Sequence, residues 1–202
     1  MDWTKLPDEK TIEKTADALR ERGIEVTIVN NKEEAKRKVL EYIPEGKEVM
    51  DVTSMTLDET GISKEIQEGG RYVSIKKKIK SVDKKEMMHL MRRMSVTADY
   101  VVGSVHAVTQ DGKVVIVSNT GSQLAPYVYG ATNVIWVVGT QKIVRNLDEA
   151  LKRIEEHTFP LEDVRMRKVY GVGSGISKIL IFEREVASNR IKLIFVKEKL
   201  GF

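Results

Sequence analysis

The sequence contains no cysteine, three histidines and four prolines. Without cysteine, the chain has no disulfide framework, no thiolate ligand for zinc or an iron–sulfur cluster, and no cysteine nucleophile. Three histidines (His89, His106 and His157) are too few for a histidine-rich metal site, so we expect no bound metal. The prolines are widely spaced and no stretch is rich in Gly, Ser or Pro, so nothing indicates a linker between domains.

Long apolar runs are also missing. The longest, residues 133–139, has the length of a strand and falls far short of the roughly 20 residues that span a bilayer. The first five residues are polar and lack the apolar core of a signal peptide. We therefore expect a cytoplasmic protein with no membrane span.

The composition suits one folded domain. The chain has 202 residues, of which 41% are hydrophobic and 32% charged, with a net charge of +4. This apolar content is too high for a disordered chain and the length allows a sizeable core. We expect a single domain over residues 1–202, with residues 1–46 as an N-terminal helix-and-strand extension packed on it.

The first half of the chain alternates between helical and strand patterns. Apolar residues at helical spacing predict helices over residues 8–22, 31–43 and 83–94, with a further helix starting near Asp58 or Ser63. Short apolar runs predict strands over residues 24–29, 48–52 and 72–75. Such alternation is typical of a parallel sheet flanked by helices.

The second half is richer in strands. Apolar runs predict strands over residues 100–103, 107–109, 114–117, 133–139, 177–183 and 191–196, with a short helix ending at Tyr129 and a longer one over 147–157. Asp111-Gly112 is a strong hairpin signal and predicts an antiparallel pair. The expected fold class is therefore α/β, with a mostly parallel sheet flanked by helices and antiparallel additions.

Three polar turns follow predicted strands, where ligands bind in open α/β sheets. The first contains Asp51, Thr53, Ser54 and Thr56. Its hydroxyls, together with the backbone amides that open the next helix, are suited to hold an anion. An ordinary helix cap is the alternative interpretation, since Ser and Thr are standard in that position.

The second turn contains Gly103, Ser104 and His106. Ser104 and His106 are two residues apart on a strand and so face the same side. A nucleophile–base pair is one interpretation, but no acid is placed to orient His106, and lining a ligand pocket is favoured. His106 has the ordinary pKa best suited to proton transfer near neutral pH.

The third turn contains Asn119, Thr120, Gly121 and Ser122. A glycine among small polar residues before a helix is the composition of a phosphate or carboxylate cradle. The turn lacks the lysine of a P-loop, and a helix-capping turn is the alternative. Residues 171–175 fit Gly-x-Gly-x-Gly, but a strand rather than a helix follows, which favours a flexible loop over a dinucleotide site.

A basic stretch lies between residues 71 and 85. Its seven cations are Arg71, Lys76, Lys77, Lys78, Lys80, Lys84 and Lys85. They are suited to contact a nucleic acid or the phosphates of CoA. Because no stacking aromatics are interleaved among the lysines, a solvated face is favoured and nucleic-acid binding is not expected.

Five segments, in the right order, resemble the LUD-domain family of LutC/YkgG-like lactate-utilization proteins. Residues 54–61 resemble its S-x-T-x-x-E-x-G segment, and 142–150 its K-I-V-x-D-L-x-E-A segment. Residues 98–112, 119–125 and the terminal 189–202 resemble three further family segments. The resemblance therefore extends over nearly the whole chain.

The resemblance implies a fold similar to glucosamine-6-phosphate deaminase, ribose-5-phosphate isomerase and the CoA transferases. It implies a small anionic metabolite in the polar turns, namely a carboxylate, a sugar phosphate or a CoA ester, in lactate or organic-acid utilization. CoA or a phosphorylated ligand is the candidate cofactor, and an iron–sulfur oxidoreductase is the candidate partner. A homodimer is expected because it is the commonest assembly.

Two departures from the family pattern stand out. His106 occupies a position where relatives often have Asn, and Gln123 one where they often have Arg, which removes a bidentate anion contact. The cysteine cluster of many relatives is absent. The sequence is compatible with two further functions. One is an enzyme of the same fold, namely an isomerase, deaminase or acyl-CoA hydrolase, with His106, Glu59 or Asp51 as acid or base. The other is a non-catalytic subunit or regulator that docks on the iron–sulfur partner.

Overall fold

The computed structural model describes the backbone of residues 1–202 and all side chains except those of residues 84, 85, 88 and 95. Two cations of the basic stretch, Lys84 and Lys85, therefore have side chains outside the described part. The chain folds around two sheets, one of six strands and one of four.

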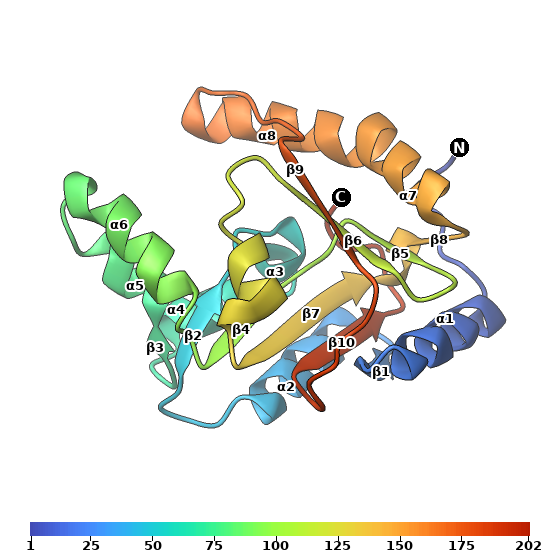
Figure 1. The fold of residues 1–202 in the computed structure, drawn as a ribbon, viewed down its shortest axis with the longest axis horizontal. Coiled ribbons are helices and arrows are strands. Elements are labelled where there is room, and N and C mark those ends of the chain that lie inside the picture. The colour runs from blue at the N-terminus through green and yellow to red at the C-terminus, as the bar shows by residue number, and fades with distance from the viewer.

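The six-stranded sheet is parallel throughout and occupies the centre of the molecule (Figure 1). Its order is β1 (Glu25–Val29), β10 (Ile191–Val196), β7 (Asn133–Gly139), β4 (Tyr100–Gly103), β2 (Glu48–Asp51) and β3 (Val73–Ser74). The central strands are apolar along their length because both faces of the sheet are covered. The α/β class expected from the sequence is confirmed. The N-terminal segment supplies β1, an edge strand of this same sheet.

Helices cover both faces of the central sheet. One face packs against α2 (Lys32–Tyr42), α3 (Met55–Glu59) and α4 (Ile62–Glu68). The other packs against α1 (Glu9–Glu21), α5 (Ile75–Lys80) and α6 (Lys84–Ser95). The single helix expected near Asp58 or Ser63 is in fact two, because Gly61 adopts a left-handed conformation, with φ of 69°, between α3 and α4.

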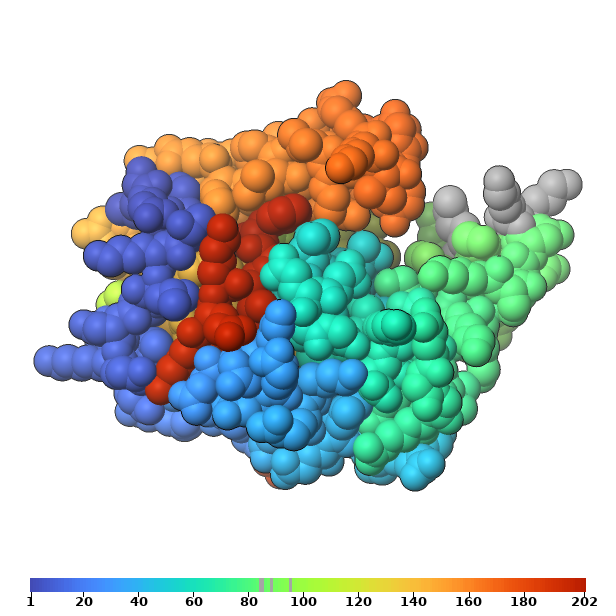
Figure 2. All heavy atoms as spheres, turned by 180° about the vertical axis from the view of Figure 1, so that it is seen from behind, coloured from blue at the N-terminus to red at the C-terminus, as the bar shows by residue number. Residues whose placement is uncertain are grey.

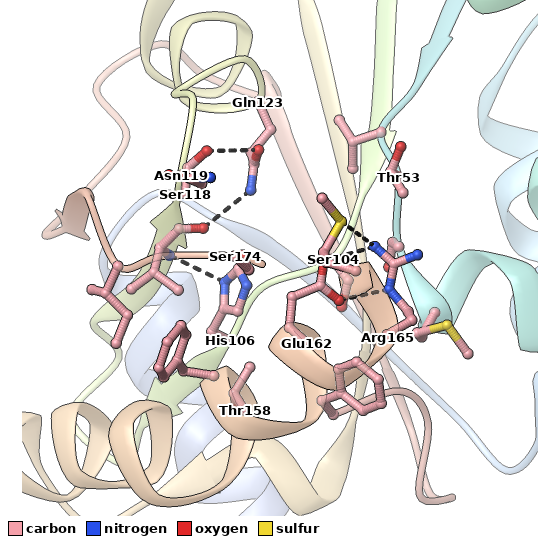
Figure 3. Close-up of a pocket in the computed structure, with 18 of the residues that line it drawn as sticks. Thr53, Ser104, His106, Ser118, Asn119, Gln123, Thr158, Glu162, Arg165 and Ser174 are labelled. Carbon is pink, nitrogen blue, oxygen red and sulfur yellow. Dashed lines mark hydrogen bonds and ion pairs between the residues drawn. The ribbon is translucent and has the colours of Figure 1, made fainter. Parts of the chain in front are cut away.

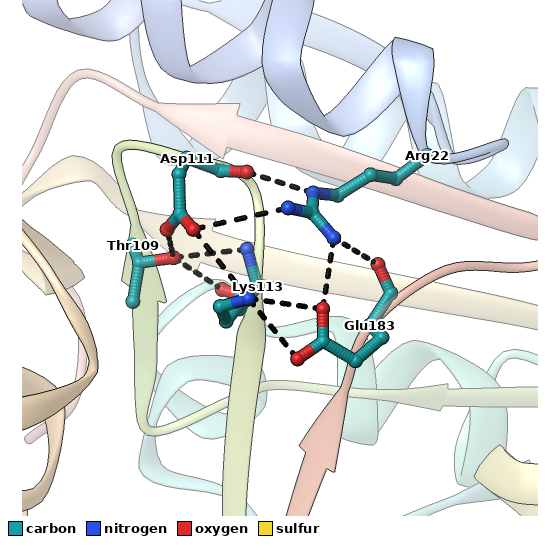
Figure 4. Close-up of polar contacts among 5 residues, drawn as sticks. All are labelled: Arg22, Thr109, Asp111, Lys113 and Glu183. Carbon is teal, nitrogen blue, oxygen red and sulfur yellow. Dashed lines mark hydrogen bonds and ion pairs between the residues drawn. The ribbon is translucent and has the colours of Figure 1, made fainter.

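The four-stranded sheet is mixed. Its order is β8 (Ile143–Val144), β5 (Ala107–Thr109), β6 (Val114–Ser118) and β9 (Lys178–Phe182). β5 and β6 are antiparallel, which confirms the hairpin predicted at Asp111-Gly112. The hairpin tip is tied to α1 and β9, since Arg22 donates to the Asp111 carbonyl (2.7 Å) and pairs with Glu183 (2.9 Å) (Figure 4).

A long helical run lies across one side of the molecule (Figures 1 and 2). It consists of α7 (Leu147–Arg153), a π-helical turn (Ile154–Thr158) and α8 (Phe159–Tyr170). The helix predicted to end at residue 157 therefore continues as far as Tyr170. Pro160 stands just after the π-helical turn, so the helical run continues across it with a local change of helix type. Among the described residues, no helix is both long and apolar enough to cross a membrane.

Candidate functional site

A pocket of about 320 Å³ opens between the central sheet, the end of β6 and helix α8 (Figure 3). The segments after β2 and β4 supply its floor, as expected for a site beyond the carboxyl ends of parallel strands. Its polar lining consists of Thr53, Ser54, Thr56, Ser104, His106, Ser118, Asn119, Thr120, Gln123, Lys142, Thr158, Glu162, Arg165 and Ser174.

Lys142 lies at the floor of this pocket, at the end of the short 3₁₀ helix that follows β7. Its side chain is almost completely buried, and its Nζ donates to Thr56 Oγ1 and Ser104 Oγ, both at 3.1 Å. Within the described part of the chain, no carboxylate forms an ion pair with it. Burial and the nearby Arg153 lower the pKa of Lys142 to about 7, while Glu59 acts weakly in the opposite direction.

Arg153 of α7 is a second buried cation behind the pocket. Its Nη1 donates to the His106 carbonyl (2.7 Å) and to Thr158 Oγ1 (2.9 Å). Its Nε and Nη2 have no hydrogen-bond partner among the described residues. Burial lowers the pKa of Arg153 to about 10, so the guanidinium is still charged at pH 7. The floor of the pocket is therefore an electropositive environment.

α8 closes the pocket with both apolar and charged side chains. Phe159, Met166 and Tyr170 supply apolar surface. Arg165 and Glu162 form a bidentate pair, with both nitrogen–oxygen distances 2.7 Å (Figure 3). Because Glu162 already neutralises Arg165, Lys142 carries the charge in the lining that has no counter-ion.

His106 lines the pocket with its ring fixed. Its Nδ1 accepts a hydrogen bond from the Val117 N–H at 3.2 Å, which places the proton of the neutral ring on Nε2. Burial and the two neighbouring cations, Lys142 and Arg153, lower the pKa of His106 to about 3. The imidazole is therefore neutral at pH 7.

The structure brings together most of the residues selected from the three polar turns, but not all. Thr53, Ser54, Thr56, Ser104, His106, Asn119 and Thr120 line the pocket, whereas Gly103, Gly121, Ser122, Asp51 and Glu59 are not among its lining residues. Gly121 instead donates its N–H to Ser118 Oγ at 2.8 Å, which shapes the third turn.

The two carboxylates selected from the sequence, Asp51 and Glu59, stabilise the structure around the pocket. Asp51 is fully buried and accepts hydrogen bonds from Gln67 (2.7 Å) and Lys76 (3.2 Å), and burial raises its pKa. Glu59 accepts a hydrogen bond from the Gly201 N–H at 2.8 Å and so fixes the segment that carries Phe202 into the lining.

Gly103 leaves space for a buried tyrosine. A Cβ atom at this position would lie 1.7 Å from Tyr127 Oη and 2.6 Å from Val52 Cγ2. We therefore expect Gly103→Ala to lower the free energy of unfolding by ~1–3 kcal/mol, measured by urea denaturation. In a Tyr127→Phe background the closest collision is removed, so the same substitution should cost less. An equal cost in both backgrounds would contradict this explanation.

The roles of Lys142 and of α8 are not predicted from the sequence. Lys142 appears there only as part of a family-like segment, although it follows the most apolar strand, where a ligand group is expected. α8 carries no clear apolar stripe, and none of its residues is fully buried, so its periodicity was a weak signal. Among the side chains that are described, no three His, Asp or Glu residues converge as a metal site.

Comparisons with known proteins agree with the fold. The family model of the LUD domain matches residues 12–196. The crystal structure of a DUF162 family protein from Deinococcus radiodurans is similar over 95% of this chain and 99% of that one, with a TM-score of 0.58 and 13% identity. eIF2B beta from Chaetomium thermophilum reaches a TM-score of only 0.39, at 15% identity over 69% of this chain and 48% of its own. No curated protein matches the sequence.

Proposed function

The chain belongs to the LUD domain family, and we propose that it binds a small anionic metabolite in the pocket between its sheets and α8, with Lys142 as the charged anchor. The observation that carries this proposal is that no carboxylate of the described residues forms an ion pair with Lys142. A buried ammonium is costly unless it is paired, and an anionic ligand supplies the pair.

The rest of the lining supports an anion of moderate size. The hydroxyl of Ser54 offers a hydrogen bond to a carboxylate or phosphate oxygen. Those of Ser118 and Thr120 donate to Gln123 Oε1 and Ser122 Oγ, and would turn toward the ligand to contact it. Phe159 and Met166 offer surface to an apolar portion of the ligand. A carboxylate and a sugar phosphate meet this description, and a CoA ester meets it through its phosphate groups. Resemblance to lactate-utilization proteins supports a role in lactate or related organic-acid metabolism.

Replacing Lys142 with methionine should weaken the binding of such a ligand by about 10- to 100-fold, the size of a lost hydrogen bond to a charged group. Isothermal titration calorimetry at pH 6.5 with L-lactate, pyruvate, glucosamine 6-phosphate and acetyl-CoA measures this loss. Lys64→Met, which removes an exposed lysine of α4, is the matched control and should bind as the wild type does. Equal affinity of wild type and Lys142→Met for every anion that binds would refute the anchor.

The affinity for the anion should also fall as the pH rises above 7. Below pH 7 Lys142 is protonated and attracts the anion, and above its pKa of about 7 the charge is lost. We expect the dissociation constant to rise by up to about tenfold per pH unit above pH 7 in the wild type, and to stay nearly flat in Lys142→Met. A wild-type affinity that is constant between pH 6 and 9 would contradict this assignment.

A further inference from the structure

We propose that Ser104 and Lys142 form a nucleophile–base pair that cleaves an activated acyl ester, either an oxygen ester or a thioester, bound in the same pocket. This inference rests on the proposed function for the pocket and its class of ligand, and adds a reaction to it. The protonated form of Lys142 binds the anion, and the neutral form acts as the base. It assigns the nucleophile to Ser104 and proton transfer to a lysine rather than to His106.

The contact between the two side chains is already at hydrogen-bond distance, 3.1 Å from Lys142 Nζ to Ser104 Oγ, and both residues line the pocket. A nucleophile within reach of a base, with the base oriented by a third group, is the arrangement by which serine hydrolases are recognised. Thr56 is that third group, since Lys142 Nζ also donates to its Oγ1.

Thr56 is in turn fixed by the segment before Phe202. Its Oγ1 donates to the Leu200 carbonyl at 3.3 Å. Gly201 has φ of 62°, and a Cβ there would lie 2.5 Å from Thr56 Oγ1. The directions of the hydrogen bonds agree along this chain: Thr56 donates to Leu200, Lys142 donates to Thr56, and the neutral amine has a lone pair left for the Ser104 hydroxyl proton. Thr56 is therefore a positioning residue.

The charges around Lys142 favour a base that works near neutral pH. Arg153 on α7 is a charged neighbour, His106 before β5 is neutral, and Glu59 on α3 is the acid that acts on Lys142 from a distance. A desolvated lysine beside a second cation loses its proton more readily than an exposed one. Close to pH 7, part of the protein then carries the neutral amine that the reaction requires.

The proposed reaction is a hydrolysis, and water is its only co-reactant. As Ser104 Oγ bonds to the acyl carbon, Lys142 Nζ takes the hydroxyl proton. The bond from the acyl carbon to the leaving oxygen or sulfur breaks, and that atom receives the proton from Lys142. Water then attacks the acyl-serine carbon and gives a proton to Lys142, and this proton returns to Ser104 Oγ as the carboxylic acid leaves. The net change is one ester and one water to one acid and one alcohol or thiol.

A fluorophosphonate probe tests the nucleophile directly, because it reacts with activated serines irrespective of the natural substrate. Peptide mass spectrometry should locate the label on Ser104. Ser104→Ala and Lys142→Met should each lose at least 100-fold in labelling rate, the range expected for removal of a nucleophile or its base. Ser188→Ala, in an exposed turn, is the control and should label as the wild type does. A wild type that is not labelled, or is labelled elsewhere, overturns the pair.

A thiol version of the pair gives a second readout that needs no turnover. Because the chain has no cysteine, Ser104→Cys introduces a single thiol whose alkylation by iodoacetamide can be followed against pH. Lys142 should lower the pH midpoint of alkylation by about one unit or more relative to Ser104→Cys combined with Lys142→Met. Identical midpoints would show that Lys142 does not act on residue 104 and would overturn the proposal.

Binding of anions to Ser104→Ala separates this inference from the proposed function. If anions bind but wild-type Ser104 is not labelled, Ser104 is not the nucleophile and the proposed binding function still holds. If Ser104 is labelled but no anion binds, the nucleophile–base pair is supported and the anionic ligand is ruled out. Trapping of pyruvate on Lys142 by borohydride would make the lysine the nucleophile and would overturn the pair.

Discussion

Lys142→Met should fold more stably than the wild type at pH 7 and below, and the gain should disappear as the pH rises to 10. The wild-type lysine is buried with a pKa of about 7, whereas in the unfolded chain its pKa is near 10.4. Between these values the unfolded state binds a proton that the folded state does not, so wild-type stability rises with pH by about 1.4 kcal/mol per unit. Methionine does not titrate and lacks this dependence.

The measurement is chemical denaturation of both proteins at pH 6, 7, 8, 9 and 10. Taking the difference between them cancels the titration of groups that they share, including the buried Asp51. Lys64→Met is the control, because Lys64 is exposed and its difference from wild type should be flat with pH. A flat difference for Lys142→Met as well would mean that Lys142 is not held in a disfavoured protonation state.

The stability of Lys142→Met also bears on function. Lys142 lowers stability and provides the unpaired charge of the pocket. Residues of this kind are typical of sites selected for binding or chemistry rather than for folding. The same variant that gains stability below pH 7 is expected to lose anion affinity there. Opposite changes in one variant would separate a functional lysine from a structural one.

Trp136→Ala should cost about 3–5 kcal/mol of unfolding free energy, the largest loss that we expect from one side chain. Trp136 stands in β7, has no exposed surface, and packs edge-on against Tyr127 and Phe182 with ring centroids 5.5 Å apart in both cases. Phe182 belongs to the second sheet, so the indole fills the space between the two sheets. Removing it leaves a cavity that the strands on either side cannot readily close.

Thermal and urea unfolding of Trp136→Ala and Trp136→Phe measure this contribution. The phenylalanine variant keeps an aromatic ring in the cavity and should retain more stability than the alanine variant. The indole Nε1 has no hydrogen-bond partner among the described residues, so the phenylalanine variant loses packing but no hydrogen bond. A loss below 1 kcal/mol for Trp136→Ala would show that the two sheets do not depend on this side chain.

Much of the fold was predictable because it follows from local physics. Asp8 and Asn31 cap their helices through side-chain oxygens, which is typical of Asp and Asn before a helical pattern. The apolar run over residues 133–139 forms β7 with those bounds, since a strand covered on both faces needs apolar residues throughout. The hairpin at Asp111-Gly112 follows from the left-handed conformation that Gly112 supplies.

The site was predictable only in outline. Polar turns after strands pointed to the edge of the sheet where the pocket opens, and the family resemblance favoured an anionic ligand. Neither identified Lys142, because a lysine after a strand is ordinary until its surroundings are known. Neither identified α8, because a helix with few buried residues has a weak apolar period.

The sequence by itself determined the strands, the helix caps, the hairpin and the α/β class, since each depends on hydrogen bonds and burial patterns within about a dozen neighbouring residues. The tertiary structure alone decided that Thr56, Ser104 and Lys142 meet. Their contacts span 86 and 38 residues of chain and exist only because β4 and β7 are neighbours in the sheet, with β2 beside β4. The same packing buried Lys142 and placed Arg153 near it, and so gave an ordinary lysine its lowered pKa.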